Sequence, residues 1–254
     1  MYTHERREKI MDLLQSKDPI SVNELSNELE VSKATIRSDL TYLSNNNLII
    51  RTHGGATKTK ENEIIKKDIN YEARKQINIE QKQEIAKKAM NFIKQGECII
   101  LDASSTCYEL ARLISQSDKK ITVLTNGLRT ATILKENFNL TVIVIGGVVK
   151  GKSNAIEGTL GIEILKKVNI DTLFTSAYAI SDTEGLSDFN LYEVELKKKM
   201  IEVSTKTIGL VDSSKFGKKS IATFASLEQL DTIITDNQIS TETKNNYINL
   251  VNIE

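Results

Sequence analysis

The stretch SVNELSNELEVSKATIRSDLTYL, residues 21–43, carries the start signals of two successive helices. Ser21 and Glu24 have the spacing of a capping box, in which the serine accepts a hydrogen bond from the first turn and the glutamate reaches back to the serine backbone. Ser32 is a second N-cap. The helix that it opens has apolar residues at i, i+4 and i+7, which are Ile36, Leu40 and Leu43. Two capped helices joined by a tight turn predict a helix-turn-helix.

The outer face of the second helix is polar and basic, which suits the major groove of double-stranded DNA. Its side chains can hydrogen-bond to base edges, and amides at its N-terminus can meet a phosphate. The candidate DNA contacts on this helix are Ser32, Lys33, Thr35, Arg37, Ser38 and Thr41. The same spacing also occurs in small structural bundles, where these residues would only be solvated.

The segment LIIRTHGGATKT, residues 48–59, favours DNA binding over the structural bundle. It alternates short apolar and basic runs around Gly54 and Gly55, a pattern that predicts a hairpin. A hairpin directly after a recognition helix is a wing. Arg51 and His53 on this hairpin are therefore further candidate DNA contacts.

Charge is distributed unevenly along the chain. The 34 basic and 34 acidic residues give a formal net charge of +0, which argues against nonspecific coating of nucleic acid. Residues 31–60, however, contain five basic residues against Asp39 alone, a local net charge of +4. The five are Lys33, Arg37, Arg51, Lys58 and Lys60. This patch can neutralise a DNA backbone, and a symmetric homo-oligomer, a dimer or a tetramer, would present it more than once.

The length of 254 residues predicts a small module followed by one domain of about 180 residues. We expect a DNA-binding domain at 1–58, a charged linker at 59–78 and a second domain at 79–254, beginning with an amphipathic helix from Ile79 to Lys94. No apolar run approaches the roughly 20 residues that cross a bilayer, and the N-terminus lacks the apolar stretch of a signal peptide. A cytoplasmic protein without membrane contact is expected.

The cysteines and histidines give no indication of a metal or cofactor site. Cys98 opens an apolar strand and Cys107 lies on an apolar helix face, so both are expected to be reduced thiols, although a redox pair is the alternative. His4 and His53 are isolated, and no Cys/His spacing typical of a metal site occurs. We expect no metal and no cofactor.

Short continuous apolar runs alternate with helical stretches in the second domain. They are Cys98 to Leu101, Ile121 to Leu124, Thr141 to Ile145, Thr172 to Ala177, Thr207 to Val211 and Thr232 to Ile234. Continuous runs indicate strands covered on both faces, so the fold class is α/β with a mostly parallel sheet and flanking helices. In such sheets ligands collect at the carboxyl ends of the strands.

Polar motifs follow four of these predicted strands. They are Asp102 with Ser104, Ser105 and Thr106; Asn126 with Gly127; Gly146 with Gly147; and Asp212 with Lys215. Hydroxyls and amides at a helix N-terminus, with a nearby lysine, favour a phosphate, while Asp102 and Asn126 suit sugar hydroxyls. The alternatives are plain helix capping at Ser105 and Thr106, a turn at the glycine pair, and a solvated Lys215.

The segments VSKATIRSDLTYL and RTHGGA, between Val31 and Ala56, resemble the DNA-binding signature of the DeoR family of bacterial transcriptional regulators. LDASST, LTNG, IGG, EGLSD and LVDSSKFG follow in the family's order and approximate spacing, so the resemblance covers nearly the whole chain. Ser38 stands where the family usually has arginine, so we expect one DNA contact to differ.

The resemblance implies a winged helix-turn-helix followed by a sensor domain with the fold of ribose-5-phosphate isomerase and glucosamine-6-phosphate deaminase. That domain would bind a phosphorylated sugar. By motif, the resemblance adds Lys150 and Glu193 to the implied effector contacts, although Glu193 lies on a helix and suits the surface equally well. Ser104, Ser176 and Ala179 stand where the family usually has glycine, so the pocket is expected to be smaller or tuned to another metabolite.

We therefore expect a transcriptional regulator, a repressor of a carbohydrate operon, whose operator affinity is controlled by a phosphorylated sugar. One alternative is a constitutive DNA-binding protein with a decayed effector site, which the three glycine replacements favour. The other is a sugar-phosphate isomerase or deaminase. An enzyme would need a carboxylate base, for which Asp102 and Glu193 are the only candidates, and we assign no catalytic residue.

Overall fold

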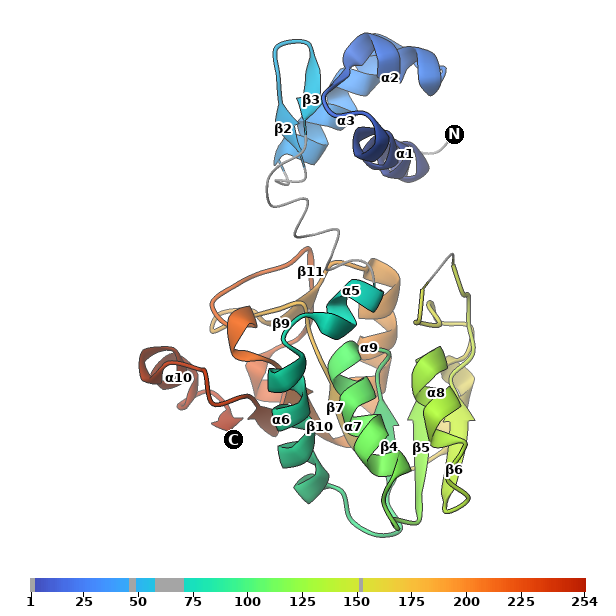
Figure 1. Cartoon of the computed structure of the whole chain (residues 1–254), viewed down its shortest axis with the longest axis vertical. Coiled ribbons are helices and arrows are strands. Elements are labelled where there is room, and N and C mark those ends of the chain that lie inside the picture. Colours follow the sequence, from blue (N-terminus) through green and yellow to red (C-terminus); the bar gives the residue numbers. More distant parts are fainter. Residues whose placement is uncertain (1–2, 46–48, 58–70, 151–152) are drawn as a thin grey trace. The chain divides into compact units, whose positions relative to one another are not determined.

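The chain folds into two compact units, Met1–Ala73 and Arg74–Glu254. The computed structural model describes residues 3–45, 49–57, 71–150 and 153–254 (Figure 1). The two units are described in turn.

Within residues 3–45 and 49–57, the first unit forms helices and short strands. They are α1 (Thr3–Ser16), β1 (Ile20–Ser21), α2 (Val22–Glu28), α3 (Lys33–Asn45), β2 (Ile50–Arg51) and β3 (Gly55–Thr57). The expected capping box is present, since the Ser21 amide donates to Glu24 Oε2 at 2.9 Å and the Glu24 amide to Ser21 Oγ at 3.1 Å. Ser32 Oγ accepts from the Thr35 amide at 3.2 Å and so begins α3. The predicted helix-turn-helix is confirmed.

The wing is a three-stranded antiparallel sheet in the order β1-β3-β2. The predicted hairpin supplies β2 and β3, and β1 pairs with the far side of β3, a pairing that the two residues of β1 were too short to signal. Gly55 is required there because a Cβ at that position would lie 2.0 Å from the carbonyl oxygen of Ile20. Gly55 therefore allows β3 to pair closely with β1, the strand that precedes α2, whereas a Cβ on Gly54 would meet nothing within 4 Å.

A buried ion pair joins α1 to the recognition helix α3. Asp39, which is 1% exposed, accepts from Arg6 Nε at 2.6 Å and from Arg7 Nε at 2.8 Å. The carboxylate of Asp39, the one acidic residue of the basic patch, is thus neutralised by two arginines of α1. Lys58 and Lys60, which also belong to that patch, lie outside the described residues.

The second unit alternates strands and helices. The division between the units falls within α5 (Tyr71–Gln76). The helices that follow are α6 (Ile79–Ala89), α7 (Ser105–Ser115), α8 (Leu128–Leu134), α9 (Leu191–Val203) and α10 (Thr241–Tyr247). Short 3-10 turns are η1 (Met90–Phe92), η2 (Ile162–Lys167), η3 (Ser213–Lys215) and η4 (Leu227–Gln229). Its strands are β4 (Cys98–Leu101), β5 (Ile121–Thr125), β6 (Leu140–Val144), β7 (Ile170–Thr175), β8 (Ala179–Ser181), β9 (Gly185–Asp188), β10 (Ser204–Leu210), β11 (Ala222–Ala225), β12 (Thr232–Ile234) and β13 (Asn252–Ile253).

The main sheet has seven strands in the order β13-β12-β10-β7-β4-β5-β6, and every pairing is parallel. The six predicted strands are all present, with β4 and β12 at the predicted residues. From β4 the chain builds outward to β6, and it then returns to β7 on the other side of β4. The order of the sheet therefore reverses between β4 and β7, which is where such folds bind ligands.

A second, antiparallel sheet with the order β11-β9-β8 was not predicted. Its strands are three or four residues long, and β9 reads GLSD, a poor strand sequence by local propensity. All four residues of β9 are nevertheless buried, because β8 and β11 flank it and α9 packs on it. Tertiary packing, rather than propensity, makes this segment a strand.

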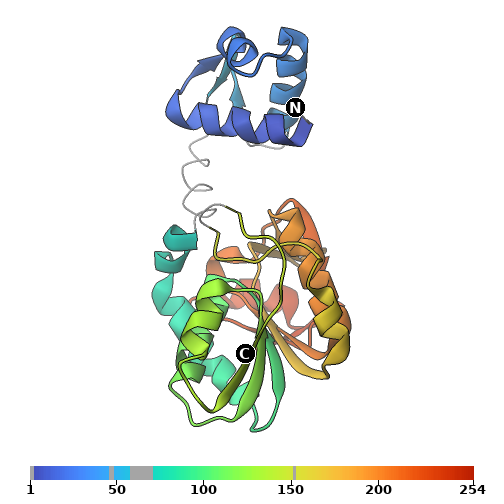
Figure 2. The ribbon, with the colours of Figure 1, turned by 90° about the vertical axis from the view of Figure 1, so that its right-hand side faces the viewer.

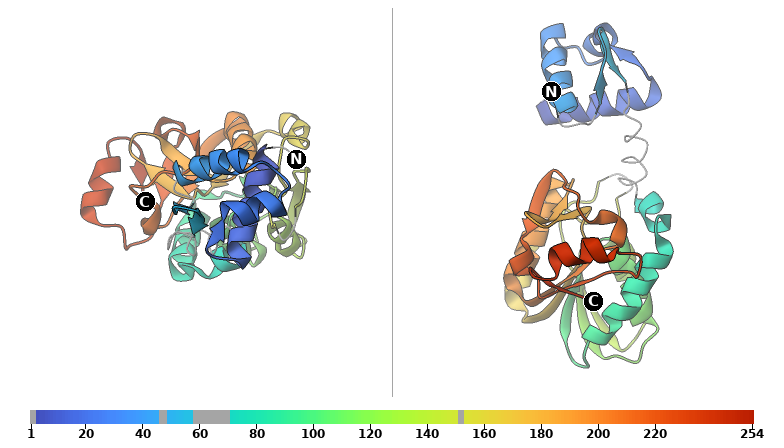
Figure 3. Two further views of the ribbon diagram at one scale, coloured as in Figure 1. Left: turned by 90° about the horizontal axis from the view of Figure 1, so that it is seen from above. Right: turned by 90° about the vertical axis from the view of Figure 1, so that its left-hand side faces the viewer.

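Helices cover both faces of the main sheet (Figure 2). On one face α6 and α7 pack on β4 and β10 around an aliphatic core, and on the other α9 and the small sheet pack on β7. The helix α10 and the strand β13 lie at the β12 edge (Figure 3, right). This two-sided burial explains the continuous apolar runs in the sequence.

The segment expected as a linker, residues 59–78, differs in part from that expectation. Positions 59–70 lie outside the described residues, but Tyr71–Gln76 forms the helix α5, whose polar sequence YEARKQ gave no helical period. The limits 1–58, 59–78 and 79–254 remain predictions. The helix expected from Ile79 is α6, which η1 extends to Phe92.

Asp39→Asn is expected to loosen the first unit. The change leaves two arginines near a neutral side chain, and breaking a buried pair in this way costs roughly 3–5 kcal/mol. Hydrogen exchange of the α3 amides in the full chain should accelerate accordingly, whereas the exposed Asp12→Asn on α1 should have no effect. Unchanged protection of α3 in the Asp39 variant would contradict the assigned role.

Candidate functional site

The helix α3 has one buried and one exposed face, as its apolar period predicted. Ile36, Leu40 and Leu43 are buried. The exposed face carries Ser32, Lys33, Arg37, Ser38 and Thr41, while Thr35 is half-buried beside Ser32. The candidate base-reading residues thus lie on one accessible surface.

Two of the candidate DNA contacts bind each other. Arg51 Nη1 on the wing donates to Thr41 Oγ1, and that hydroxyl donates to the Arg37 carbonyl at 2.8 Å. Thr41 is therefore engaged as both donor and acceptor, and it joins the wing to the recognition helix. His53 is exposed near the tip of the hairpin.

In the second unit, Asp102 occupies the point where the strand order reverses. It follows β4 and is 1% exposed. Its Oδ2 accepts from Thr175 Oγ1 at 2.7 Å and from the Ser176 amide at 2.9 Å, and its Oδ1 accepts from the Ser104 amide at 3.0 Å. Burial alone would raise the pKa of Asp102, but Lys197 and these hydrogen bonds lower it below its usual value. Asp102 is thus a buried anion that ties the ends of β4 and β7 together.

The cation that balances Asp102 is Lys197 of α9, which the sequence had not singled out. Its ammonium lies 3.3 Å from Asp102 Oδ2 and 2.8 Å from Asp188 Oδ2, and it donates to the Ser176 carbonyl at 2.7 Å. Burial alone would lower the pKa of Lys197, but Asp188, Asp102 and Glu193 raise it above its usual value. The side chain is therefore a fixed positive charge inside the domain.

A second lysine binds the next carbonyl of the same turn. Lys215 Nζ donates to the Ala177 carbonyl at 2.6 Å and lies 3.4 Å from Ser176 Oγ and 3.6 Å from Asp212 Oδ2. Asp212 caps the 3-10 turn that carries Lys215. The predicted pair Asp212 and Lys215 is thus brought to the end of β7, beside Asp102.

The start of α7 contributes hydroxyl groups to the same place. Ser104 caps the helix by accepting from the Cys107 amide at 3.2 Å, so the cap lies at Ser104 and not at Ser105 or Thr106, where the capping alternative had placed it. Ser105 and Thr106 are buried, and Thr106 Oγ1 lies 3.5 Å from Ser176 Oγ. The side chain of Ser176, at a position where the sequence resemblance implies glycine, therefore occupies space between Thr106 and Lys215.

Asn126, after β5, has one satisfied and one unsatisfied end. Its Nδ2 donates to the Ile156 carbonyl at 3.0 Å, but its Oδ1 is buried without a hydrogen-bond partner. Gly127 allows a close approach, since a Cβ there would lie 3.2 Å from the Ala103 Cα and 2.9 Å from Thr130 Oγ1. An acceptor facing inward without a donor is suited to a ligand hydroxyl.

The glycine pair after β6 has different explanations at its two positions. A Cβ on Gly147 would lie 2.4 Å from the Glu157 carbonyl oxygen, so this glycine permits the pairing of Val148 with Glu157. A Cβ on Gly146 would meet nothing within 4 Å. Gly147 is thus required by the fold, and effector contact at either glycine remains a prediction.

Glu193 belongs to a chain of polar groups that begins in the loop after β6. Asn190 Nδ2 donates to Glu157 Oε1 at 2.9 Å and to Glu193 Oε1 at 3.2 Å. Lys150 lies beside this chain, 4.5 Å from the centre of the Tyr192 ring. Burial raises the pKa of Glu193 from 4.5 to about 7, with Lys197 opposing that shift.

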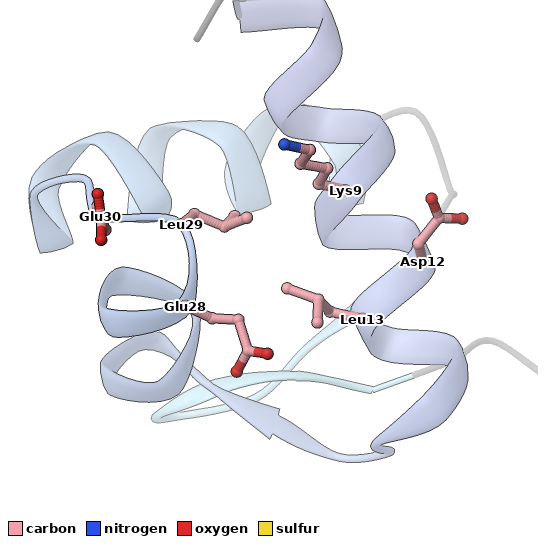
Figure 4. Close-up of a pocket in the computed structure, with 6 residues that line it drawn as sticks. All are labelled: Lys9, Asp12, Leu13, Glu28, Leu29 and Glu30. Carbon is pink, nitrogen blue, oxygen red and sulfur yellow. The ribbon is translucent and has the colours of Figure 1, made fainter.

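Two cavities lie away from these residues. One of about 470 Å³ is in the first unit between α1 and the end of α2, lined by Lys9, Asp12, Leu13, Glu28, Leu29 and Glu30 (Figure 4). Another of about 270 Å³ lies along α9 and β11, lined by Lys198, Glu202, Thr223, Phe224, Ala225, Ser226 and Gln229. Neither contains a predicted effector residue.

The cysteines are not a redox pair in this structure. Both are free, and Cys107 Sγ donates to the Phe174 carbonyl at 3.3 Å. Burial raises the pKa of Cys107 well above its usual value. Within the described ranges, no cluster of His, Cys, Asp and Glu could hold a metal ion, and no helix has the length and apolar character of a membrane span.

Glu193 predicts a pH dependence of stability. The pKa of Glu193 is 4.5 in the unfolded chain and about 7 in the folded protein. Between these two pH values the folded protein keeps a proton that the unfolded chain has already released, so the free energy of unfolding falls as the pH rises through that window. Glu193→Gln should therefore raise the free energy of unfolding by roughly 1–3 kcal/mol at about pH 8 and by much less at about pH 5. The matched control is Glu195→Gln on the exposed face of α9, and thermal unfolding at the two pH values is the measurement. Equal effects at both values would contradict the raised pKa.

Comparison with known proteins agrees with this architecture. Residues 6–62 match the DeoR-like helix-turn-helix domain, and residues 77–237 match the DeoR C terminal sensor domain. The chain is 42% identical over 240 residues to the HTH-type transcriptional regulator GolR of Listeria innocua, covering 94% of this chain and 93% of that protein.

Further relatives are also named as regulators. The chain is 32% identical to the putative aga operon transcriptional repressor of Escherichia coli O157:H7 (93% of this chain, 87% of that protein) and 32% identical to the lactose phosphotransferase system repressor of Lactococcus lactis (92% and 91%). Ribose 5 phosphate isomerase A from Neisseria gonorrhoeae matches at a TM-score of 0.41 and 18% identity over 53% of this chain and 52% of that one, a likeness too weak to carry an argument. Two matched domains and relatives along nearly the full length show that the chain belongs to the DeoR family of transcriptional regulators.

Proposed function

We propose that the chain represses a carbohydrate operon and that a phosphorylated sugar, bound at the carboxyl ends of the strands in the sensor domain, lowers its affinity for operator DNA. The operator would be contacted by the exposed face of α3 and by the wing. Relatives named as repressors of the aga operon and of the lactose phosphotransferase system support the choice of pathway class.

Two buried oxygen atoms that accept no hydrogen bond carry the proposal for the effector. Asn126 Oδ1 and Asp212 Oδ2 are buried without a hydrogen-bond partner, at the ends of β5 and β10. These strands flank β4 and β7, so the two oxygens lie on either side of the point where the strand order reverses. Buried acceptors are normally satisfied, and sugar hydroxyls are donors of the right kind. Lys215 beside Asp212 would supply charge for a phosphate.

The DNA side of the proposal depends on exposed donors. Arg37 is exposed near the middle of α3, and Arg51 is held on the wing by Thr41. An arginine on a recognition helix can donate two hydrogen bonds to one guanine base. An arginine on a wing more often contacts the phosphate backbone of the DNA. Cooperation between two copies on a repeated operator would require a homo-oligomer, a dimer or tetramer.

A constitutive regulator is the second candidate, and Ser176 is the observation that favours it. Its hydroxyl lies within 3.5 Å of both Thr106 Oγ1 and Lys215 Nζ, so a side chain fills space that glycine would leave to a ligand. An enzyme is a weaker candidate because the relatives are named as regulators. Turnover of ribose 5-phosphate or glucosamine 6-phosphate, abolished by Glu193→Gln, would establish catalysis instead.

The first test is binding of the full chain to the DNA upstream of its own gene, titrated with a panel of phosphorylated sugars at fixed salt. One compound should weaken operator binding by about 5- to 150-fold, which corresponds to a typical coupling free energy of 1–3 kcal/mol. The unphosphorylated sugar is the control and should have little effect. Tight binding that no compound alters would favour the constitutive regulator.

Two arginine variants should separate base reading from backbone contact. Arg37→Ala should cost roughly 1–3 kcal/mol of specific binding and relax the operator sequence preference. Arg51→Ala should weaken binding to all sequences alike and reduce the salt dependence of the affinity. Operator affinity equal to that of the wild type in both variants would show that α3 and the wing are not the interface.

A further inference from the structure

The sensor unit begins with a short segment, Arg74–Asn78, that we call the strap. It comprises the end of α5 and the turn into α6, and it lies at one end of the domain beside the ends of α7 and α9 (Figure 1). In the sequence it is the part of the sensor unit nearest to the DNA-binding domain. None of its residues stood out in the sequence.

Asn78 fastens the strap to the loop that carries Lys215. Its backbone adopts the left-handed conformation, with φ of 52°, which costs free energy for a residue other than glycine. This conformation is compatible with two hydrogen bonds from Nδ2, to Asp212 Oδ1 at 3.0 Å and to Ser214 Oγ at 3.0 Å. The strap is therefore in direct contact with the candidate effector site.

Two lysines add to this attachment. Lys82 of α6 is buried, and its ammonium donates to the Arg74 carbonyl and, at 2.6 Å, to the Ile77 carbonyl. Lys75 lies 4.9 Å from the centre of the Tyr108 ring on α7. The strap thus contacts three elements that surround the carboxyl ends of the strands.

Arg74 is the residue of the strap whose polar contacts are incomplete. Its guanidinium lies 5.7 Å from the centre of the Phe189 ring, just before α9. Its Nε is buried with no hydrogen-bond partner, and among the described residues no carboxylate forms an ion pair with it. A buried guanidinium donor without an acceptor is costly, and an anion with several oxygens is its natural partner.

We propose that Arg74 is a ligand for the phosphate group of the effector, so that the bound effector holds the strap directly. The inference rests on the proposed function in that the effector carries a phosphate monoester. A planar guanidinium can donate two parallel hydrogen bonds to phosphate oxygens, which a sugar hydroxyl cannot accept in the same way. The polar residues Asn190 and Glu193, which follow Phe189, are then placed to meet the sugar portion.

A purely structural role would leave different features. An arginine that only neutralised acidic neighbours would be expected to donate two parallel hydrogen bonds from its guanidinium to one of their carboxylates. Glu193 instead retains a pKa of about 7, although the charge of Arg74 acts to lower it. The observed contact of the Arg74 guanidinium is with the Phe189 ring, and its Nε remains without an acceptor, as an anion site requires.

The position of Arg74 also gives the ligand a route to the DNA-binding domain. A ligand can shift an equilibrium only through its different affinities for the two states. A ligand that contacts Arg74 has an affinity that depends on the conformation of the strap. The strap is also where the chain from the DNA-binding domain joins the sensor fold. The contacts of Asn78 with Asp212 and Ser214 make the conformation of the strap depend on the Lys215 loop.

The test is saturable binding of inorganic phosphate to the full chain, measured by isothermal titration calorimetry at constant ionic strength. Arg74→Gln should weaken phosphate binding by at least about tenfold, and Arg74→Lys should recover part of the loss because it restores charge without the fork. Lys87→Gln is the matched control, since it removes one exposed positive charge from α6, and its affinity should equal that of the wild type.

The proposal is wrong if Arg74→Gln binds phosphate with the affinity of the wild type. A lower melting temperature of this variant, with unchanged phosphate affinity, would also contradict it. Operator release provides the separate readout. A sugar phosphate that releases both the wild type and Arg74→Gln at the same concentration would overturn the role of Arg74 while the proposed function stands. If no sugar phosphate releases the wild type, the proposed function fails, and the phosphate titration still decides whether Arg74 binds the anion.

Discussion

The buried ion pair between Asp102 and Lys197 is the interaction on which the sensor domain depends. Ions of both signs are costly to bury, and such a pair persists only when its remaining lone pairs and protons are satisfied. Here Thr175, Ser176 and Asp188 supply those partners. The ion pair therefore fixes the conformation of the turn after β7. The positions of the residues that face the candidate site depend on that conformation.

The sequence could predict much of the fold because local patterns carry it. The run Cys98–Leu101 is apolar at every position because β4 is covered on both faces, and the strand occupies those residues. The capping box at Ser21 likewise depends on residues three apart, so it is visible in the chain and present in the structure. Parallel strands also place their following loops together, which is why Asp102 and Asp212 could be assigned to one region.

The remaining site residues could not be predicted, because their roles come from partners distant in sequence. Lys197 reads as one of three consecutive lysines on a helix, and only packing shows that it is buried while Lys198 and Lys199 pair at the surface. Glu157 and Arg74 similarly look like solvated charges. The small antiparallel sheet was missed for the same reason, since its strands are too short for a period to develop.

The sensor domain is incomplete in a way that bears on regulation. Asn126 Oδ1, Asp212 Oδ2 and Arg74 Nε are buried without hydrogen-bond partners, and each such group costs free energy as long as it has none. A molecule that donated to or accepted from these groups would bind the state in which they are buried more tightly than a state in which they reach water. The unsatisfied groups would thus provide the difference in affinity that a conformational switch needs, and a fully satisfied site of the same shape would give a more stable but less responsive domain.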